Sequence, residues 1–221
     1  MSDFLYQFTL EPSIKRNGKC HSWELLTKNI TNQSAIFTPD TFIFSSLNEQ
    51  DKINVFEAQL ELINTSLQAI TNNNIVSINV DDLLTDHILN DTYIYDYLFN
   101  SRNIALEINE YFHEFRKNTT KDLEALSLLC PIWLDDYGSG YTNSKLLKRF
   151  EFNCVKIDKD MFWKNENKLT LSTLCNLIFS YCNEIIIEGI ETDKQRDLIY
   201  SIGGVSGQGR IWKDQYINID M

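Results

Sequence analysis

Short apolar runs rich in β-branched residues alternate along the chain with longer segments in which apolar residues recur every three or four positions. The short runs predict strands, and the longer segments predict amphipathic helices. In the clearest helical pattern, apolar residues are spaced 3, 4, 3, 4 and 3 apart within Lys52–Ile70. This spacing places them on one face of a helix that packs against a sheet. The turn Asn17-Gly18 predicts that the first two strands form a hairpin.

Eight strands are predicted in this way: Phe4–Thr9, Trp23–Leu26, Ile75–Val80, Ile104–Ile108, Ile132–Leu134, Cys154–Ile157, Ile185–Ile187 and Val205–Gln208. Helices are predicted over Lys52–Ile70, from Asp82 towards Phe99, over Thr120–Leu129, near Ser144–Phe150, over Leu169–Cys182 and from Thr192 to Gly203. From the third strand onwards, strands and helices alternate, as is typical of a parallel sheet. An open doubly wound sheet and a closed barrel both fit this alternation. Eight strands with polar residues at nearly every strand end favour the barrel.

Composition narrows the class of protein. The chain has 221 residues, of which 43% are hydrophobic and 23% are charged, as expected for one domain over residues 1–221. A formal net charge of −11 disfavours binding to duplex nucleic acid or anionic lipid. No apolar run approaches the roughly 20 residues of a membrane span, and no signal peptide is recognisable, so membrane insertion is not expected. Five cysteines without a CxxC pair are typical of reduced thiols in a cytoplasmic protein.

Polar side chains follow apolar residues at most of the predicted strand ends: Glu24, Asn79, Glu107, Asp135, Asp136, Lys156, Asp158, Glu188 and Gln208. In a parallel barrel these ends meet at one rim. Carboxylate and amide oxygens without His or Cys suit Mg²⁺ or Mn²⁺ better than Zn²⁺. Neighbouring aspartates can bridge two ions, an arrangement used to displace an oxygen at phosphorus.

Each of these residues also has an ordinary explanation when taken singly. Asp135-Asp136 could form a solvated turn. Lys156 could lie on the rim or face inward. Taken together, however, six strands that end in metal-type donors are improbable by accident, so the pattern indicates a metal site.

At this point the chain resembles the EAL domain family, bacterial cyclic di-GMP phosphodiesterases, over nearly its whole length. The segments that carry the resemblance are Glu24-Leu25-Leu26-Thr27-Lys28, the Asn79 strand, Glu107-Ile108-Asn109-Glu110, Asp135-Asp136-Tyr137-Gly138-Ser139-Gly140-Tyr141, Lys156-Ile157-Asp158, Glu188-Gly189-Ile190-Glu191 and Gln208-Gly209. The D-D-[FY]-G-x-G-Y and K-I-D segments at this spacing are highly specific together.

The resemblance implies an α/β fold, a (β/α)₈ TIM-like barrel whose first strand is antiparallel to the rest. Only 13 residues follow Gln208, so we expect a shortened C-terminus. The resemblance further implies hydrolysis of the second messenger cyclic di-GMP to linear pGpG, and through it regulation of biofilm formation and motility. Two ions, Mg²⁺ or Mn²⁺, would be bound: one by Glu24, Asn79, Glu107 and Asp135, the other by Asp135, Asp136 and Glu188.

Further roles follow from the resemblance. Lys156 would orient the attacking water and offset the developing charge, with Glu188 and Gln208 also in the catalytic set. Substrate contacts are implied for Leu26, Lys28, Asp158 and Glu191. Glu110 would hold the loop Tyr137–Tyr141, which borders the dimer interface in the family, so a homodimer is expected.

Several positions depart from the family pattern. Leu25 replaces an Ala and is expected beside the substrate, Lys28 replaces an Arg, Asn109 replaces a Thr, and Arg210 replaces a Tyr. Lys28 keeps the charge of Arg but loses its bidentate fork for phosphate. These departures leave an alternative function open. A degenerate domain could bind a protein partner, such as a transcription regulator, with or without cyclic di-GMP and without turning it over.

Overall fold

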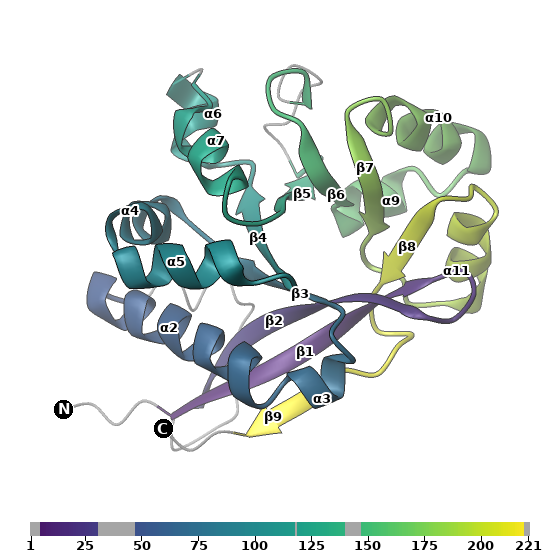
Figure 1. Cartoon of the computed structure of the whole chain (residues 1–221). Helices are drawn as coiled ribbons and strands as arrows, with labels where there is room; N and C mark the ends of the chain where they lie inside the picture. Colours follow the sequence, from purple (N-terminus) through teal and green to yellow (C-terminus); the bar gives the residue numbers. More distant parts are fainter. Residues whose placement is uncertain (1–4, 31–46, 118, 140–146, 219–221) are drawn as a thin grey trace.

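The structure is a computed structural model that describes residues 5–30, 47–117, 119–139 and 147–218. It begins with a long antiparallel hairpin (Figure 1). Strand β1 (Leu5–Lys15) pairs with β2 (Cys20–Ile30), and Gly18 has a φ of +77° in the turn between them. The predicted hairpin is therefore confirmed, although both strands are longer than expected. Pro12 is accommodated within β1 because it lies between the segment that pairs with β9 and the segment that pairs with β8.

Parallel strands continue the sheet from β2 in the order β3 (Ile75–Asn79), β4 (Ile104–Asn109), β5 (Ile132–Tyr137), β6 (Phe152–Ile157), β7 (Cys182–Ile187) and β8 (Val205–Gln208). Strand β8 then pairs antiparallel with β1 and closes the barrel. A ninth strand, β9 (Gln215–Asn218), adds to β1 beyond the closed ring (Figure 1). The expected eight-stranded barrel with an antiparallel first strand is thus confirmed.

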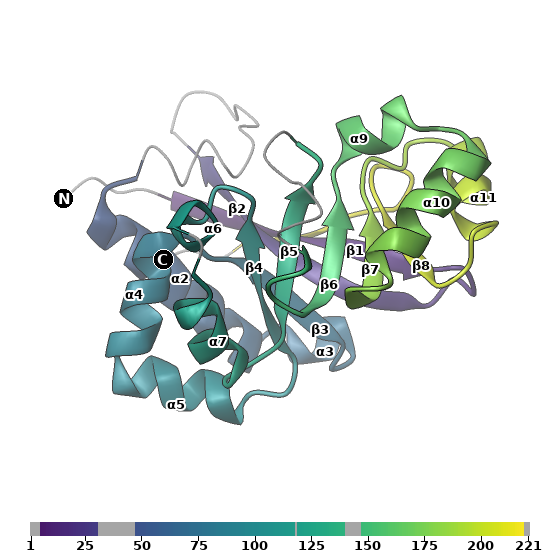
Figure 2. The ribbon, with the colours of Figure 1, turned by 90° about the horizontal axis from the view of Figure 1, so that it is seen from above.

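Helices flank the strands on two sides (Figure 2). They are α2 (Glu49–Thr65), α3 (Gln68–Thr71), α4 (Asp82–Asn90), α5 (Thr92–Asn100), α6 (His113–Lys117), α7 (Lys121–Ser127), α9 (Lys159–Lys164), α10 (Lys168–Ile178) and α11 (Asp193–Tyr200). The first three residues of the helix expected near Ser144–Phe150 lie outside the described residues; Leu147 is helical, and a turn follows it. None of the helices that the structure describes is long and apolar enough to cross a membrane.

Three predicted helices differ from the observed ones. The helix expected over Lys52–Ile70 ends at Thr65, and a separate short helix, α3, follows it. The helix expected from Asp82 towards Phe99 is divided at Asp91, whose carboxylate accepts hydrogen bonds from Tyr93 and Ile94 and so caps a new helix. Helix α10 ends at Ile178, and Cys182 begins β7 instead of ending the helix. The apolar spacing that predicted a longer helix belongs to two consecutive elements that bury their side chains in one core.

The buried hydrophobic residues form two clusters, one outside the barrel wall and one inside it. The large cluster lies between the outer face of the strands and the helices, and Leu25, Phe56 and Leu106 are among its fully buried members. The small cluster lies inside the barrel and consists of Ala105, Trp133, Cys154 and Ile186, one from each of four neighbouring strands. The interior is therefore packed rather than open, as is usual for barrels of this size.

Candidate metal centre

The candidate site lies directly above the small cluster inside the barrel. Each residue of that cluster is followed two positions later by a charged residue: Glu107, Asp135, Lys156 and Glu188. Because side chains in a strand alternate between two faces, residues two apart share a face. These four charged side chains therefore point into the barrel near the C-terminal ends of their strands. For Lys156, the orientation that the sequence left open is inward.

Asp135 and Asp136 reach the same pocket although they are adjacent in β5. Neighbouring residues of a regular strand point to opposite faces. Here the pairing of β5 with β6 shifts in register between Leu134 and Tyr137, and Asp136 has a φ of +56°. This left-handed conformation is uncommon for a residue other than glycine and marks a site with a special geometric requirement. The bulge allows both carboxylates to face Glu188.

Lys156 is the centre of the pocket. Its ammonium nitrogen lies 2.8 Å from Glu24 Oε2, 2.9 Å from Glu107 Oε2, 3.1 Å from Asp135 Oδ1 and 2.9 Å from Glu188 Oε1. Only 1% of the lysine side chain is exposed. A buried ammonium is strongly penalised without such partners. Four carboxylates and one lysine thus form a single buried network.

Burial and, after it, the excess of negative charge favour the protonated form of several carboxyl groups in the pocket. Burial, followed by the charge of Glu24, raises the pKa of Glu107 well above 4.5. Burial also raises the pKa of Glu188 to about 8 and that of Asp136 to about 7. The surrounding carboxylates outweigh burial at Lys156 and raise its pKa well above 10.5. Crowded carboxylates hold protons in this way when too few cations neutralise them.

Two groups of oxygens in the pocket could each hold a metal ion, and within each group the oxygens lie within 4.8 Å of one another: Glu24, Glu107 and Asp135 form one, and Asp135, Asp136 and Glu188 form the other. Asn79 adjoins the first group, since its Nδ2 donates to Glu24 Oε1 at 3.3 Å. Glu107 Oε1 is buried and accepts no hydrogen bond from the residues that the structure describes.

Charge and donor chemistry both fit divalent ions. Five carboxylates and one ammonium leave an excess of four negative charges when all are ionised, which two divalent cations would balance. A donor set made of carboxylate and amide oxygens suits Mg²⁺ or Mn²⁺. The structure thus brings together all six residues that the sequence indicated as metal ligands.

Gln208 connects this pocket to a carboxylate that the sequence analysis missed. Its Nε2 donates to Glu24 Oε2 at 2.6 Å and to Glu11 Oε2 at 3.4 Å. Glu11 lies on β1 directly opposite Glu24 on β2. Burial, followed by the charge of Glu24, raises the pKa of Glu11. The register that places Glu11 opposite Glu24 includes a shift between Ser13 and Ile14, so the turn signal Asn17-Gly18 alone did not predict this pair.

The three candidate substrate residues in or near the signature segment have different surroundings. Leu26 is half-buried and shares a face of β2 with Glu24. Lys28 lies further along β2, opposite Gln7 of β1. Leu25, expected beside the substrate, is instead fully buried between the barrel and the helices. That expectation was wrong because Leu25 points to the opposite face of the strand from Glu24.

Asp158 and Glu191 lie at the same end of the barrel but have partners of their own. The buried Asp158 caps α9, since its Oδ1 accepts hydrogen bonds from the amides of Asp160 and Met161. Glu191 is exposed, and its Oε1 lies 3.4 Å from Arg210 Nη1. Arg210 thus adds a cation to the loops after β7 and β8.

Glu110 contacts the segment that follows the paired aspartates. The amide of Gly138 donates to Glu110 Oε1 at 2.6 Å, and the glutamate is buried. Gly138 has a φ of +102°, and a Cβ there would lie 2.0 Å from Met161 Sδ. The backbone therefore requires glycine at this position. The rest of the loop, from residue 140 onwards, lies outside the described residues.

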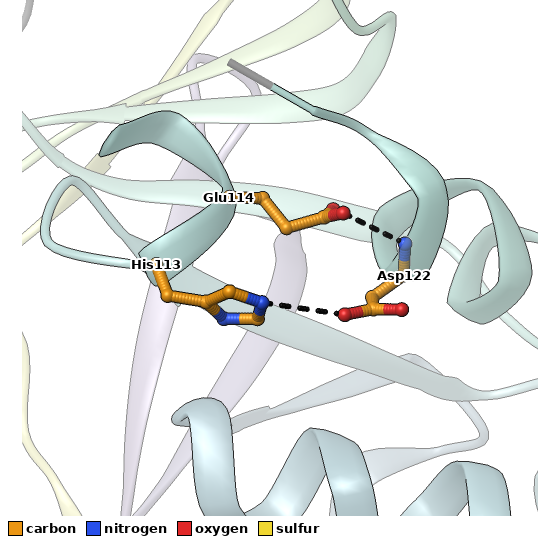
Figure 3. A group of neighbouring side chains, drawn as sticks. All are labelled: His113, Glu114 and Asp122. Carbon is orange, nitrogen blue, oxygen red and sulfur yellow. Dashed lines mark hydrogen bonds and ion pairs between the residues drawn. The ribbon is translucent and has the colours of Figure 1, made fainter. Parts of the chain in front are cut away.

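A third group of potential metal ligands, His113, Glu114 and Asp122, lies outside the barrel (Figure 3). The Glu114 carboxylate already accepts hydrogen bonds from the amides of Asp122 and Leu123, each at 3.0 Å. His113 bridges Asp82 at 2.7 Å and Asp122 at 3.3 Å. These contacts favour a structural role, in which the group joins α4, α6 and α7.

Comparison with known proteins places this geometry in a family context. A family model described as EAL domain matches residues 6–214. Cyclic di-GMP phosphodiesterase PdeH of Escherichia coli is 22% identical over 209 residues, which cover 91% of this chain and 80% of PdeH. Anti-FlhC(2)FlhD(4) factor YdiV of Salmonella typhimurium is 19% identical over 207 residues, which cover 91% of this chain and 87% of YdiV.

Solved structures show the same fold. The crystal structure of the EAL-like domain protein YdiV has a TM-score of 0.82 and 23% sequence identity, and the match covers 96% of this chain and 93% of that one. Klebsiella pneumoniae BlrP1, solved as a calcium and cyclic di-GMP complex, has a TM-score of 0.76 and 20% identity. That match covers 97% of this chain and 57% of BlrP1.

Proposed function

This chain belongs to the EAL domain family, and on that premise we propose that it is a metal-dependent phosphodiesterase that hydrolyses cyclic di-GMP to linear pGpG. The observation that carries the proposal is the pair of carboxylate groups that share Asp135, with Lys156 between them. The similarity to PdeH, whose name describes this activity, supports the same assignment.

Glu24, Asn79, Glu107 and Asp135 would hold one Mg²⁺ or Mn²⁺ ion, and Asp135, Asp136 and Glu188 would hold the other. When bound, two such ions supply the Lewis acidity that hydrolysis of a phosphodiester requires. Lys156 would bind the attacking water and offset negative charge that develops as one P–O ester bond breaks. Gln208 keeps Glu24 in place through its 2.6 Å hydrogen bond.

The remaining candidate residues have supporting roles in this proposal. Leu26, Lys28, Asp158 and Glu191 would contact the dinucleotide outside the metal pocket. Glu110 would hold the segment after Asp135-Asp136 through its hydrogen bond with Gly138. We further propose that residues 1–221 form one domain that acts in the cytoplasm as a homodimer, which light scattering would test.

A turnover assay tests the central proposal. The purified protein is incubated with cyclic di-GMP and either Mn²⁺ or Mg²⁺, and linear dinucleotide is measured. Glu107→Gln keeps the side-chain shape but removes one ligand charge, and we expect kcat to fall by more than the roughly 100-fold that loss of an outer-sphere partner can cause. Glu184→Gln serves as the matched control, because Glu184 lies on the same barrel and pairs with His21 away from the pocket. Binding of the nucleotide by the parent protein without product formation would contradict the proposal.

A second function is favoured by one specific observation, the likeness to YdiV, which is named as a factor acting against FlhC and FlhD. In this reading the chain binds a protein partner such as a transcription regulator and does not turn over cyclic di-GMP. Leu25, Lys28 and Asn109, which depart from the family pattern, support it. The same assay separates the two functions, since a regulator of this kind would bind a partner but release no linear dinucleotide.

A further inference from the structure

Glu11 faces the interior of the barrel at the level of the metal pocket. Directly opposed residues of neighbouring strands point to the same face of a sheet, and Glu11 is directly opposite Glu24. Two residues further along β1, Ser13 is directly opposite Gln208 of β8. Glu11 therefore lies beside both Glu24 and Gln208, where the antiparallel strand closes the barrel.

A single nitrogen links the two glutamates. Gln208 Nε2 donates to Glu24 Oε2 at 2.6 Å and to Glu11 Oε2 at 3.4 Å. A side-chain amide nitrogen carries two hydrogens, so both are used by these two carboxylates. Carboxylates accept hydrogen bonds and repel a carbonyl oxygen, so the pair fixes which end of the Gln208 amide faces β1 and β2.

The orientation of the Glu24 carboxylate depends on its hydrogen-bond donors, one of which is the Gln208 amide nitrogen. Its Oε1 accepts a hydrogen bond from Asn79, and its Oε2 accepts from Lys156 and from Gln208. Each donor comes from a different strand, so together they fix the orientation of the carboxylate. Among the described residues, Glu11 belongs to neither group of potential metal ligands. Apart from its direct charge interaction with Glu24, its contact with the pocket is made through Gln208.

We infer that Glu11 is a positioning residue of the metal pocket, which holds the Gln208 amide in the orientation that donates to Glu24. The inference rests on the proposed function, because it assumes that Glu24 binds a metal ion. Without an acceptor at position 11, Glu24 alone orients the Gln208 amide, and the hydrogen bond to Glu24 is held less firmly. Loss of such an outer-sphere partner of a metal ligand commonly weakens metal binding by about 10–100-fold.

Two substitutions separate positioning from charge. Glu11→Ala removes the acceptor, whereas Glu11→Gln removes the charge but retains a carbonyl oxygen that can accept from Gln208. Mn²⁺ affinity is measured from the electron paramagnetic resonance signal of the free ion, and thermal unfolding confirms that each variant is folded. We expect Glu11→Ala to weaken Mn²⁺ binding about 10-fold and Glu11→Gln to bind close to the parent level. Glu184→Gln is the control and should bind as the parent does.

A double-mutant cycle tests the route through Gln208. In a Gln208→Ala background, Glu11→Ala should cause no further loss of Mn²⁺ affinity, because the group through which Glu11 acts is already absent. Parent-level binding by Glu11→Ala, equal losses in Glu11→Ala and Glu11→Gln, or additive losses with Gln208→Ala would each overturn the inference.

The outcome for the proposed function is read separately. If the parent protein binds Mn²⁺ but produces no linear dinucleotide, the phosphodiesterase proposal fails and the Glu11 inference is still decided by the variants. If the parent protein binds no Mn²⁺, both are overturned.

Discussion

The ammonium nitrogen of Lys156 lies 2.9 Å from Glu107 Oε2, and neither side chain is appreciably exposed. A lysine on β6 and a glutamate on β4 are thus in direct contact inside the barrel, two strands apart in the sheet. Removing one member of a buried ion pair leaves the other charge uncompensated, which is far more destabilising than losing a surface pair.

Lys156→Met should therefore destabilise the metal-free protein by about 3–5 kcal/mol. Divalent ions should restore part of this loss, because they bind the same carboxylates. Urea unfolding in EDTA and in Mn²⁺ measures both effects, and Lys168→Met on the exposed face of α10 is the control. A variant as stable as the parent in EDTA would show that the lysine does not neutralise the pocket.

The raised pKa values of Asp136 and Glu188 predict how stability depends on pH. A folded-state pKa of about 7 or 8 lies above the ordinary values of 3.8 and 4.5, so the folded protein binds these protons more tightly than the unfolded chain does. The resulting stability is complete below about pH 4 and is lost as the pH rises through 7–8. In EDTA, we expect the fall in Tm between pH 5 and 8.5 to be smaller in Glu188→Gln than in the parent.

Mn²⁺ should oppose this dependence, because a metal ion competes with protons for the same oxygens and binds more tightly as the pH rises. The increase in Tm caused by Mn²⁺ should thus be larger at pH 8.5 than at pH 5. An increase of equal size at both pH values would be inconsistent with binding at Asp136 and Glu188.

Glu110→Ala removes the acceptor for the Gly138 amide. Hydrogen bonds to charged groups contribute about 1.5–3 kcal/mol, so the free energy of unfolding should fall by this amount. Because Gly138 follows the paired aspartates, Mn²⁺ binding should weaken as well. Calorimetry with Glu110→Gln as the conservative control measures both changes, and unchanged Mn²⁺ affinity in the Ala variant would separate this contact from the pocket.

Glu114→Ala should have a different signature. Thr120, at the N-terminus of α7, makes no side-chain capping bond, and Glu114 accepts from the first amides of this helix instead. Loss of a cap lowers stability by about 1–2 kcal/mol. The number of Mn²⁺ ions bound per chain should not change. A reduced stoichiometry would mean that His113, Glu114 and Asp122 hold an ion after all.

Periodicity was sufficient for the order of strands and helices, because local patterns carry it, but it did not distinguish a closed barrel from an open doubly wound sheet. It failed where the role of a residue depends on a neighbouring strand or helix and not on the element that contains the residue. The first strand was predicted to end at Thr9, since Glu11 and Pro12 interrupt the apolar pattern. Glu11 was consequently missed as a neighbour of the pocket. The boundary at Asp91 was missed because an aspartate in an apolar segment does not by itself indicate a cap.

The candidate ligands were predictable because each follows an apolar strand, but their mutual geometry was not. A pair of adjacent aspartates does not reveal a bulge, and the φ of +56° at Asp136 depends on the pairing of β5 with β6. Likewise, the inward orientation of Lys156 depends on which face of β6 the helices cover. Such features are properties of the assembled sheet, and no single segment contains them.

Because β8 must pair with β1 to close the barrel, we expect the cation pocket to be completed late in folding. This pairing joins Ser13 to Gln208, positions separated by nearly the whole chain, and contacts between such distant residues form slowly. A nascent chain synthesised as far as Glu188 contains all the acidic residues of the candidate site. It still lacks β8, the strand that closes the barrel. Metal binding would then require that β8 has been synthesised and has paired with β1.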